Sequence, residues 1–307
     1  MEGVDGLRPR SVVGVLLALT CTWGYVPAPA LGVEDVLILG RDTPIRQAPR
    51  GSAKVLKTAR PGQTYEIASR KAGKIHPIYL LDEDGDLWVR IRIDQVAVGF
   101  VRNDLAAVGR EEHQSPRGSS LLVVNQRVTA DGSVDTDLWL VQEGWRSTRL
   151  LGSVEGRPIW SSLGEWFICQ MDSGQAVKDP LMDRTVERIE KFSADGRQRT
   201  LLASGTYPIL NEARGDVYFY RDVDDHGEHV PAGLFTVSVE GGPPRPVYLL
   251  PERYKFWKED GDYFVQAPPP VLQAAGTRIQ FYAFEPMGSR VRFTVGLDGQ
   301  FFELRRD

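Results

Sequence analysis

One loop of the sequence brings histidine and carboxylate side chains together at short spacing. Its members are Asp222, Asp224, Asp225, His226 and His229. Imidazole nitrogens and carboxylate oxygens are common ligands of divalent cations, so this spacing is compatible with one bound ion. A hydrophilic loop between two strands has the same composition for solubility alone. We therefore predict no metal and no cofactor, and these five residues are the candidate ligands if a metal is bound.

The sequence has no recognised catalytic pattern. It contains no G-x-S-x-G nucleophile elbow, no G-x-G-x-x-G turn and no Walker loop. With 2 cysteines and 4 histidines, a Cys-His site has few residues to draw on. No two carboxylates stand out as an acid and a base. We therefore predict that the chain is not an enzyme and has no catalytic residues.

Aromatic residues in the N-terminal third form a candidate ligand-binding groove. They are Tyr65, Tyr79, Trp88 and Phe100. Flat aromatic rings can provide a surface on which a ligand packs. Trp88 alternates with Leu87 and Val89 along an expected strand, so one of the two faces belongs to the core. A core position for Trp88 is therefore an open alternative to ligand binding.

The composition and the length indicate what kind of protein must position these residues. Of 307 residues, 42% are hydrophobic and 25% are charged, as in ordinary globular proteins, and the length suggests about two domains. The 37 Lys and Arg residues against 41 Asp and Glu residues give a net charge of −4. Such a chain lacks the basic surface that binds nucleic-acid phosphates, so we predict no nucleic-acid partner.

Residues 1–30 have the pattern of a secretory signal peptide. Arg8 and Arg10 precede an apolar run over residues 11–19, and Ala28 and Ala30 provide the small side chains that signal peptidase requires. The pattern predicts cleavage after Ala30 and export to the periplasm or the extracellular space, with no membrane span in the mature chain. The alternatives are an uncleaved N-terminal anchor and a lipoprotein.

The two cysteines bear on these alternatives. A lipoprotein would be lipidated at Cys21, but Thr20 precedes it, whereas lipoprotein signals favour Gly, Ala or Ser at that position. Cleavage after Ala30 leaves Cys169 as the single cysteine of the mature chain. It lies in the apolar run 166–169, which predicts a buried structural thiol.

Residues 33–108 alternate short apolar stretches with turn residues, which predicts a small all-β domain. The motifs are PIRQAP at 44–49, RPGQTYEI at 60–67, LWVRI at 87–91 and GFV at 99–101. This pattern resembles the bacterial SH3 domain, with Phe100 where that family usually has tryptophan. The resemblance implies a small barrel that binds cell-wall peptides or protein segments.

Residues 109–118 are predicted to be a linker, because they are polar and contain no large apolar side chain before Gly118. Beyond them, residues 119–307 repeat an apolar strand, a turn with glycine and another apolar strand. The turn glycines Gly164, Gly215 and Gly261 lie 51 and 46 residues apart. A period in the high forties with four strands per unit is typical of β-propeller blades.

The wording of these repeats resembles the TolB-type β-propeller, most closely over residues 157–168 and 195–202. The resemblance implies about four blades in a closed or partial ring. Four tryptophans at repeated strand positions are predicted to be blade-to-blade core. They are Trp139, Trp160, Trp166 and Trp257. The fold class is therefore all-β: a signal peptide, an SH3-like barrel and a partial or four-bladed propeller.

These features predict a secreted, non-enzymatic binding or scaffold protein of the bacterial cell envelope. The SH3-like module would dock to a cell-wall peptide or an envelope protein, and the propeller would offer a protein-interaction surface. The alternatives are a hydrolase or lyase with its site on the propeller axis, and a structural subunit of an envelope assembly.

Overall fold

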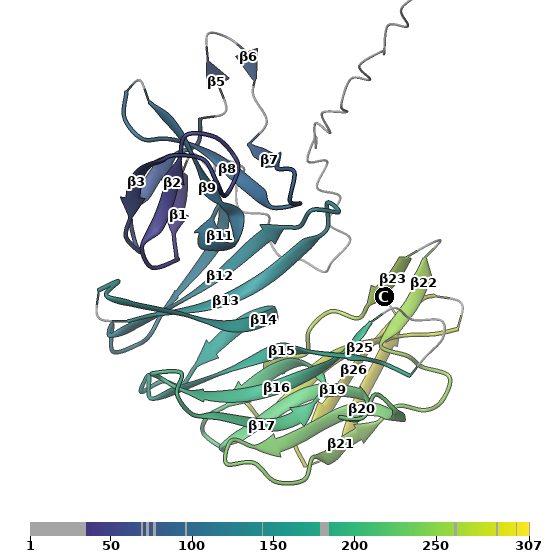
Figure 1. The fold of residues 1–307 in the computed structure, drawn as a ribbon. Coiled ribbons are helices and arrows are strands. Elements are labelled where there is room, and N and C mark those ends of the chain that lie inside the picture. Colours follow the sequence, from purple (N-terminus) through teal and green to yellow (C-terminus); the bar gives the residue numbers. More distant parts are fainter. Residues whose placement is uncertain are drawn as a thin grey trace, which may run out of the picture.

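A computed structural model describes residues 35–306, except 69, 72–73, 76–77, 96, 143, 179–183, 261–262, 287 and 299. Strands and one short 3-10 helix make up all its regular secondary structure over these ranges (Figure 1). The prediction of an all-β fold with propeller-type repeats is confirmed. In the part of the chain described, no helix is long and apolar enough to cross a membrane. The predicted signal peptide, with Cys21, lies outside the described residues.

The N-terminal module contains two sheets. Its elements are β1 (Asp35–Ile38), β2 (Thr43–Arg46), β3 (Val55–Ala59), β4 (Thr64–Glu66), β5 (Arg70–Lys71), β6 (Lys74–Ile75), β7 (Tyr79–Leu81), β8 (Leu87–Arg92), β9 (Val98–Arg102), η1 (Asn103–Leu105) and β10 (Ala106–Ala107). One sheet has the order β10-β1-β4 and the other the order β3-β2-β9-β8-β7, while β5 and β6 form a separate hairpin. Val89 and Ile91 on β8 are fully buried, because alternate side chains of this strand face the module's core.

The repeat region follows as a series of antiparallel strands. They are β11 (Gly109–Gln114), β12 (Ser120–Val128), β13 (Val134–Gln142), β14 (Ser147–Trp160), β15 (Trp166–Ala176), β16 (Thr185–Ser193), β17 (Arg199–Ser204), β18 (Thr206–Asn211), β19 (Asp216–Val223), β20 (His229–Ser238), β21 (Arg245–Leu249), β22 (Trp257–Asp260), β23 (Tyr263–Gln266), β24 (Val271–Gln273), β25 (Arg278–Phe284), β26 (Arg290–Gly296) and β27 (Phe301–Arg306).

These strands form four units of four consecutive strands each. Strand β14 is long enough to end unit 1, by pairing with β13, and to begin unit 2, by pairing with β15. Unit 1 is therefore β11-β12-β13-β14 and unit 2 is β14-β15-β16-β17. Unit 3 is β18-β19-β20-β21 and unit 4 is β24-β25-β26-β27. Consecutive four-stranded antiparallel units of this kind are propeller blades.

The predicted linker is wrong over residues 109–114, which form β11, the first strand of unit 1. Its residues pair with β12 from Gly109↔Gln126 to Gln114↔Leu121. The strand is polar because charged partners, rather than apolar burial, hold it in place. Arg110 is 3.1 Å from Asp35, and Glu111 is 2.9 Å from Arg157. Composition alone therefore did not reveal this strand.

The third predicted repeat hairpin also differs from the structure. Residues 257–266 form the separate two-stranded hairpin β22–β23, and unit 4 begins only at β24. The segment 267–270, with its three prolines, connects them without regular secondary structure, because proline cannot donate to a strand ladder.

Alternation along the strands builds the cores between units. In β15, Phe167 packs with Leu122 and Leu140 of unit 1, whereas the adjacent Ile168 packs with Val217 and Phe219 of unit 3. Successive side chains of a strand point to opposite faces, so each unit contributes to two cores. Trp160 and Trp166 pack against these cores, as predicted, whereas Trp139 belongs to the cluster between the N-terminal module and unit 1. Trp257 is the exception, because it lines a pocket.

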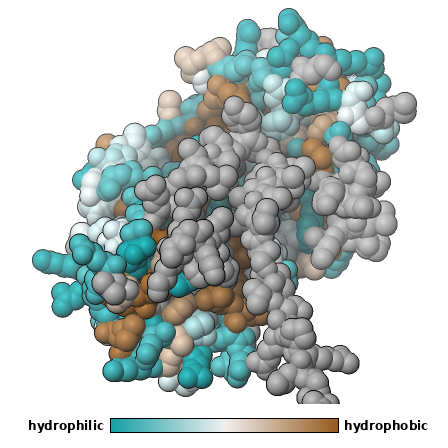
Figure 2. All heavy atoms as spheres, turned by 90° about the horizontal axis from the view of Figure 1, so that it is seen from above, coloured by the Kyte–Doolittle hydropathy of each residue, from teal (hydrophilic) through white to brown (hydrophobic). Residues whose placement is uncertain are grey.

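The N-terminal module packs directly on unit 1. Leu37 and Leu39 share a hydrophobic cluster with Val123, Trp139 and Val141 of the first unit. On the face seen in Figure 2, hydrophobic side chains reach the surface in separate groups between hydrophilic ones.

The units run in the same sense, which gives the array two different ends. At one end, Asn211 Nδ2 donates to Gly276 O at 3.0 Å, and this contact joins the turns between first and second strands of units 3 and 4. At the other end, Lys178 N donates to Gly227 O at 2.9 Å, between the second-to-third strand connections of units 2 and 3. We call this second end, where the first strands begin, the loop face (residues 153–155, 172–178, 205–207, 223–229, 285–286 and 288–289).

Gly205 joins units 2 and 3 at the loop face, and we predict that alanine there destabilises the fold. A Cβ at Gly205 would lie 2.4 Å from Phe219 Cδ2 and 2.4 Å from the carbonyl oxygen of Tyr220. Gly205→Ala should therefore lower the free energy of unfolding by about 1–3 kcal/mol. The matched control is Gly51→Ala, where a Cβ meets nothing within 4 Å. Equal urea midpoints for the two variants would contradict this view of the junction.

Candidate functional site

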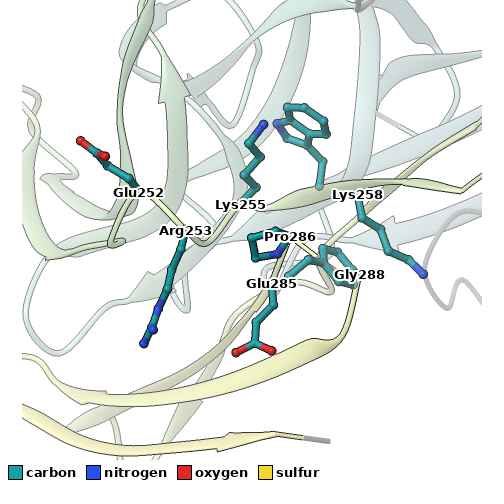
Figure 3. A pocket seen from close by; sticks show the side chains of 9 residues that line it. Glu252, Arg253, Lys255, Lys258, Glu285, Pro286 and Gly288 are labelled. Carbon is teal, nitrogen blue, oxygen red and sulfur yellow. The ribbon is translucent and has the colours of Figure 1, made fainter.

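A pocket lies where the segment before β22 meets the turn between β25 and β26. Its volume is about 480 Å³, within the range of small-ligand sites. The lining residues are Glu252, Arg253, Lys255, Trp257, Lys258, Phe284, Glu285, Pro286 and Gly288. Figure 3 shows Arg253, Lys255 and Lys258 pointing in three different directions around Pro286 and Gly288.

Backbone pairing fixes the two walls of the pocket against each other. Lys255 N donates to Phe284 O at 3.1 Å, and Phe284 N donates to Lys255 O at 2.8 Å. The turn of the second wall is closed by Gly288 N, which donates to Glu285 O at 2.8 Å. Gly288 has a φ of +80°, a conformation that suits glycine. The pocket is therefore built on a bridged backbone.

Positive charge predominates among the pocket residues. Lys255 Nζ lies 4.3 Å from the centre of the Trp257 ring, and Lys258 Nζ lies 5.7 Å from that of Phe284. The guanidinium of Arg253 lies 4.8 Å from the centre of the Tyr254 ring. Within the described ranges, neither Lys255 nor Arg253 forms an ion pair with a carboxylate. Cation–π contacts leave an ammonium or guanidinium group able to donate hydrogen bonds to a ligand.

The acidic residues of the lining do not cancel this charge. Glu285 Oε1 is 2.8 Å from Arg306 Nη2, so its carboxylate is already neutralised by a cation outside the lining. Glu252 is the other acidic member, against Arg253, Lys255 and Lys258. The pocket is therefore positively charged on a chain of net charge −4, and it suits a ligand with anionic groups.

A second polar group, near the loop face, links units 2 and 3 and the β22–β23 hairpin. Gln170 Nε2 donates to Glu187 Oε2, and Gln170 Oε1 accepts the backbone N–H of Tyr207 at 2.6 Å. The hydroxyl of Tyr207 donates to Gln266 Oε1 at 3.3 Å. We call Glu187, Gln170, Tyr207 and Gln266 the Glu187 network. Tyr207 has a φ of +54°, which is uncommon for a residue with a side chain and is held here by these bonds.

The environment of Glu187 favours its neutral form. Burial, together with the negative charge of Glu155, raises the pKa of Glu187 to about 8, whereas Arg184 opposes the shift. Burial also raises the pKa of the Tyr207 hydroxyl. At neutral pH the carboxyl of Glu187 is therefore mostly protonated. A carboxyl in this state can donate a hydrogen bond or a proton.

The predicted metal candidates do not converge in the structure. Asp222 Oδ2 is 2.8 Å from Arg184 Nη2, so its carboxylate is held by a guanidinium. Asp224 Oδ1 accepts the backbone N–H groups of His226 and Glu228, each at 2.9 Å, and so closes the turn. Across the part of the chain described, no group of three or more His, Cys, Asp or Glu side chains could hold a metal ion.

The predicted aromatic groove needs correction. Trp88 is only 1% exposed and Tyr65 only 7%, so neither ring offers a surface to a ligand. Trp88 Nε1 donates to Asp82 Oδ2 at 2.9 Å, which satisfies the polar atom of a buried indole. Tyr79 and Phe100 keep partial exposure. A ligand-binding role for these two rings stays a prediction. Cys169 is buried, as predicted.

Sequence reasoning missed the pocket and the Glu187 network. The run RYKFWK at residues 253–258 alternates cations with aromatic residues, and this pattern was a usable signal for one wall. The second wall, residues 284–288, is distant in sequence. Glu187 and Gln170 stand in ordinary strand sequence. The pairing of β15 with β16 and the junction between units 2 and 3 bring them together with Tyr207.

Comparison with known proteins finds similar solved structures at low sequence identity. No family model matches the sequence, and the search of curated proteins finds no match. An oligogalacturonate lyase in complex with manganese is similar in structure, with 13% identity, a TM-score of 0.38 and coverage of 73% of this chain and 59% of the lyase. A prolyl endopeptidase has 10% identity, a TM-score of 0.41 and coverage of 79% of this chain and 37% of its own. The β-propeller domain of the Trilobed protease from Pyrococcus furiosus has 10% identity, a TM-score of 0.33 and coverage of 74% and 79%.

These similarities correct one prediction. The statement that the chain is not an enzyme is wrong as a conclusion from missing motifs, because a lyase and a peptidase are among the similar structures. In a propeller, residues that act together come from the strands of different blades, so a search for local motifs excludes no activity. At these identities and TM-scores the similarity assigns no activity to this chain. The chain also spans less than two thirds of the lyase and of the endopeptidase.

Replacing Glu187 with glutamine should remove a pH-dependent loss of stability. The pKa of Glu187 is about 8 in the folded chain against an ordinary 4.5, so folding binds a proton between these values. The free energy of unfolding should therefore fall as the pH rises through this window and level off above it. Glu187→Gln stays neutral and should unfold at higher urea than the parent at about pH 9, with little difference at about pH 4.

The control for this measurement is Glu228→Gln. Glu228 is exposed and pairs with Lys178 at 2.9 Å. This variant should follow the parent across the pH range, because exposed ion pairs contribute little to stability. A parent and a Glu187→Gln variant with parallel pH profiles would show that Glu187 is not held neutral.

Proposed function

We propose that this chain is a binding protein whose propeller recognises an acidic peptide in the pocket between the β22 segment and the β25–β26 turn. The observation that carries the proposal is the exposed pair Arg253 and Lys255, which contact aromatic rings and form no ion pair with a carboxylate in the described ranges. Charge-assisted hydrogen bonds to such groups are about twice as strong as neutral ones.

The geometry favours several spaced carboxylates over one compact anion. The three cationic side chains point in different directions around the pocket, as Figure 3 shows, so a single phosphate would meet only one of them. A short peptide can present one carboxylate to Arg253 and another to Lys255 while its stem lies against Trp257 and Phe284. A volume of about 480 Å³ accommodates part of such a peptide rather than a folded domain.

The setting of this activity is part of the proposal. The signal-peptide pattern of residues 1–30 supports export to the periplasm or the extracellular space. The motifs of residues 44–101 support an SH3-like N-terminal module that docks to the cell wall or to an envelope protein. An acidic cell-wall peptide would then be the ligand of the propeller pocket.

A hydrolase or lyase with its site at Glu187 is the second candidate function. The observation that favours it is the pair Glu155 and Glu187, since burial and the charge of Glu155 together raise the pKa of Glu187 to about 8, at which a carboxyl can act as a general acid near neutral pH. Turnover of a glycan or peptide that is lost in Glu187→Gln but kept in Lys255→Ala would support this candidate.

Replacing Lys255 with alanine should weaken the binding of an acidic peptide. A fluorescently labelled tetraglutamate is the probe, and its affinity is measured by fluorescence anisotropy. Lys255→Ala should reduce the affinity about tenfold, because one charge-assisted hydrogen bond contributes about 1.5 kcal/mol. Added salt should weaken binding to the parent protein, and inorganic phosphate should bind more weakly than the peptide.

Lys54→Ala is the matched control. Lys54 is an exposed lysine on the N-terminal module, so this substitution removes the same charge at a site outside the pocket. It should bind tetraglutamate as the parent does. Equal losses in Lys54→Ala and Lys255→Ala would show nonspecific attraction. No binding to the parent at low salt would refute the proposed function.

A further inference from the structure

The pocket and the Glu187 network are physically connected. Trp257, which lines the pocket, stands opposite Gln266 in the β22–β23 ladder. Gln266 accepts the Tyr207 hydroxyl at 3.3 Å, and the backbone N–H of Tyr207 is held by Gln170, which donates to Glu187. A continuous path therefore runs from Glu187 on β16, through β15, β18 and β23, to one wall of the pocket.

The path reaches the pocket at Trp257, whose ring contacts the ammonium group of Lys255. The ammonium of Lys255 lies 4.3 Å from the centre of the Trp257 ring. A displacement of β23 moves its ladder partner β22 and therefore the ring beneath Lys255. Additional packing ties this hairpin region to unit 3, because Tyr220 stacks on Phe256 with ring centres 4.1 Å apart. The wall is thus coupled to the unit that carries Tyr207.

The groups that face Glu187 are mostly acidic. Glu155 on β14 raises the pKa of Glu187, and Asp172 on β15 stands directly opposite Glu187 in the ladder and also raises the pKa of Glu155. Arg184 lowers the pKa of Glu187, but its guanidinium is paired with Asp222 at 2.8 Å. Asp222 also raises the pKa of Glu187, so a negative charge on Glu187 would be repelled by Glu155 and Asp222 and only partly balanced by Arg184.

We infer that the ionisation state of Glu187 regulates the pocket, with the neutral carboxyl favouring an acidic ligand and the carboxylate opposing it. This inference rests on the proposed function for its ligand. Ionisation would drive Glu187 away from Glu155 and Asp222 and disturb Gln170, Tyr207 and Gln266 in turn. The added negative charge acts in the same direction, because it lowers the positive potential of the pocket.

The test compares the parent protein with Glu187→Gln at about pH 7 and about pH 9, at constant ionic strength, with labelled tetraglutamate as the probe. The affinity of the parent should fall by about fivefold or more between these pH values, whereas Glu187→Gln should keep its affinity. Glu228→Gln, a glutamate in the exposed loop before β20, should follow the parent. Identical pH dependence in the parent and Glu187→Gln would overturn the inference.

A second measurement tests the connection without a ligand. In protein labelled with 5-fluorotryptophan, the Trp257 resonance is assigned with Trp257→Phe and followed with pH. It should shift with a midpoint at about 8 in the parent, as the pKa of Glu187 requires. The shift should disappear in Glu187→Gln and shrink in Tyr207→Phe, which lacks the hydroxyl that contacts Gln266.

The two measurements distinguish failure of the proposed function from failure of the proposed regulation. If tetraglutamate does not bind the parent but the Trp257 resonance follows Glu187, the proposed function is wrong and the connection stands. If the peptide binds the parent equally at both pH values and the Trp257 resonance is unchanged, the regulation is wrong and the proposed function stands.

Discussion

The alternation of side chains along the middle strands of each unit is the constraint on which the structure depends. Phe167 and Ile168 are adjacent in sequence, yet one packs towards unit 1 and the other towards unit 3. Further along, Phe219 packs towards unit 2, while Tyr220 packs in the core shared with unit 4. A unit that lost this alternation would leave two cores incomplete, because every inner unit is packed on both faces.

The same alternation explains why polar chemistry gathers at the loop face. Towards the ends of β15 and β16, the row of apolar side chains that includes Ile168 gives way to Gln170 and Glu187 on the same face of the sheet. These groups are enclosed by neighbouring units but must satisfy their hydrogen bonds, and they do so with Tyr207 across the junction. A raised pKa of Glu187 follows from this enclosure. The cationic pocket lies beyond it, where the β22–β23 hairpin extends from the array (Figure 1).

Much of the fold could be predicted from the sequence, because apolar alternation and turn glycines are local signals. The polar strand β11 could not, since Arg110 and Glu111 are held by Asp35 and Arg157 rather than by burial. The candidate site was largely hidden for a related reason. Lys255 and Phe284 become neighbours only through a backbone bridge between distant segments. Trp88 was a candidate for the ligand surface because its strand position allowed either face. In the structure its side chain is buried.

The central claim is that the pocket beside Trp257 holds the carboxylates of an acidic peptide. A crystal structure of the protein with bound tetraglutamate tests it most directly. The account predicts peptide carboxylates within hydrogen-bonding distance of Lys255 Nζ and the guanidinium of Arg253, with the peptide stem against Phe284. Peptide bound on the N-terminal module, or at the other end of the units with the pocket empty, would contradict it.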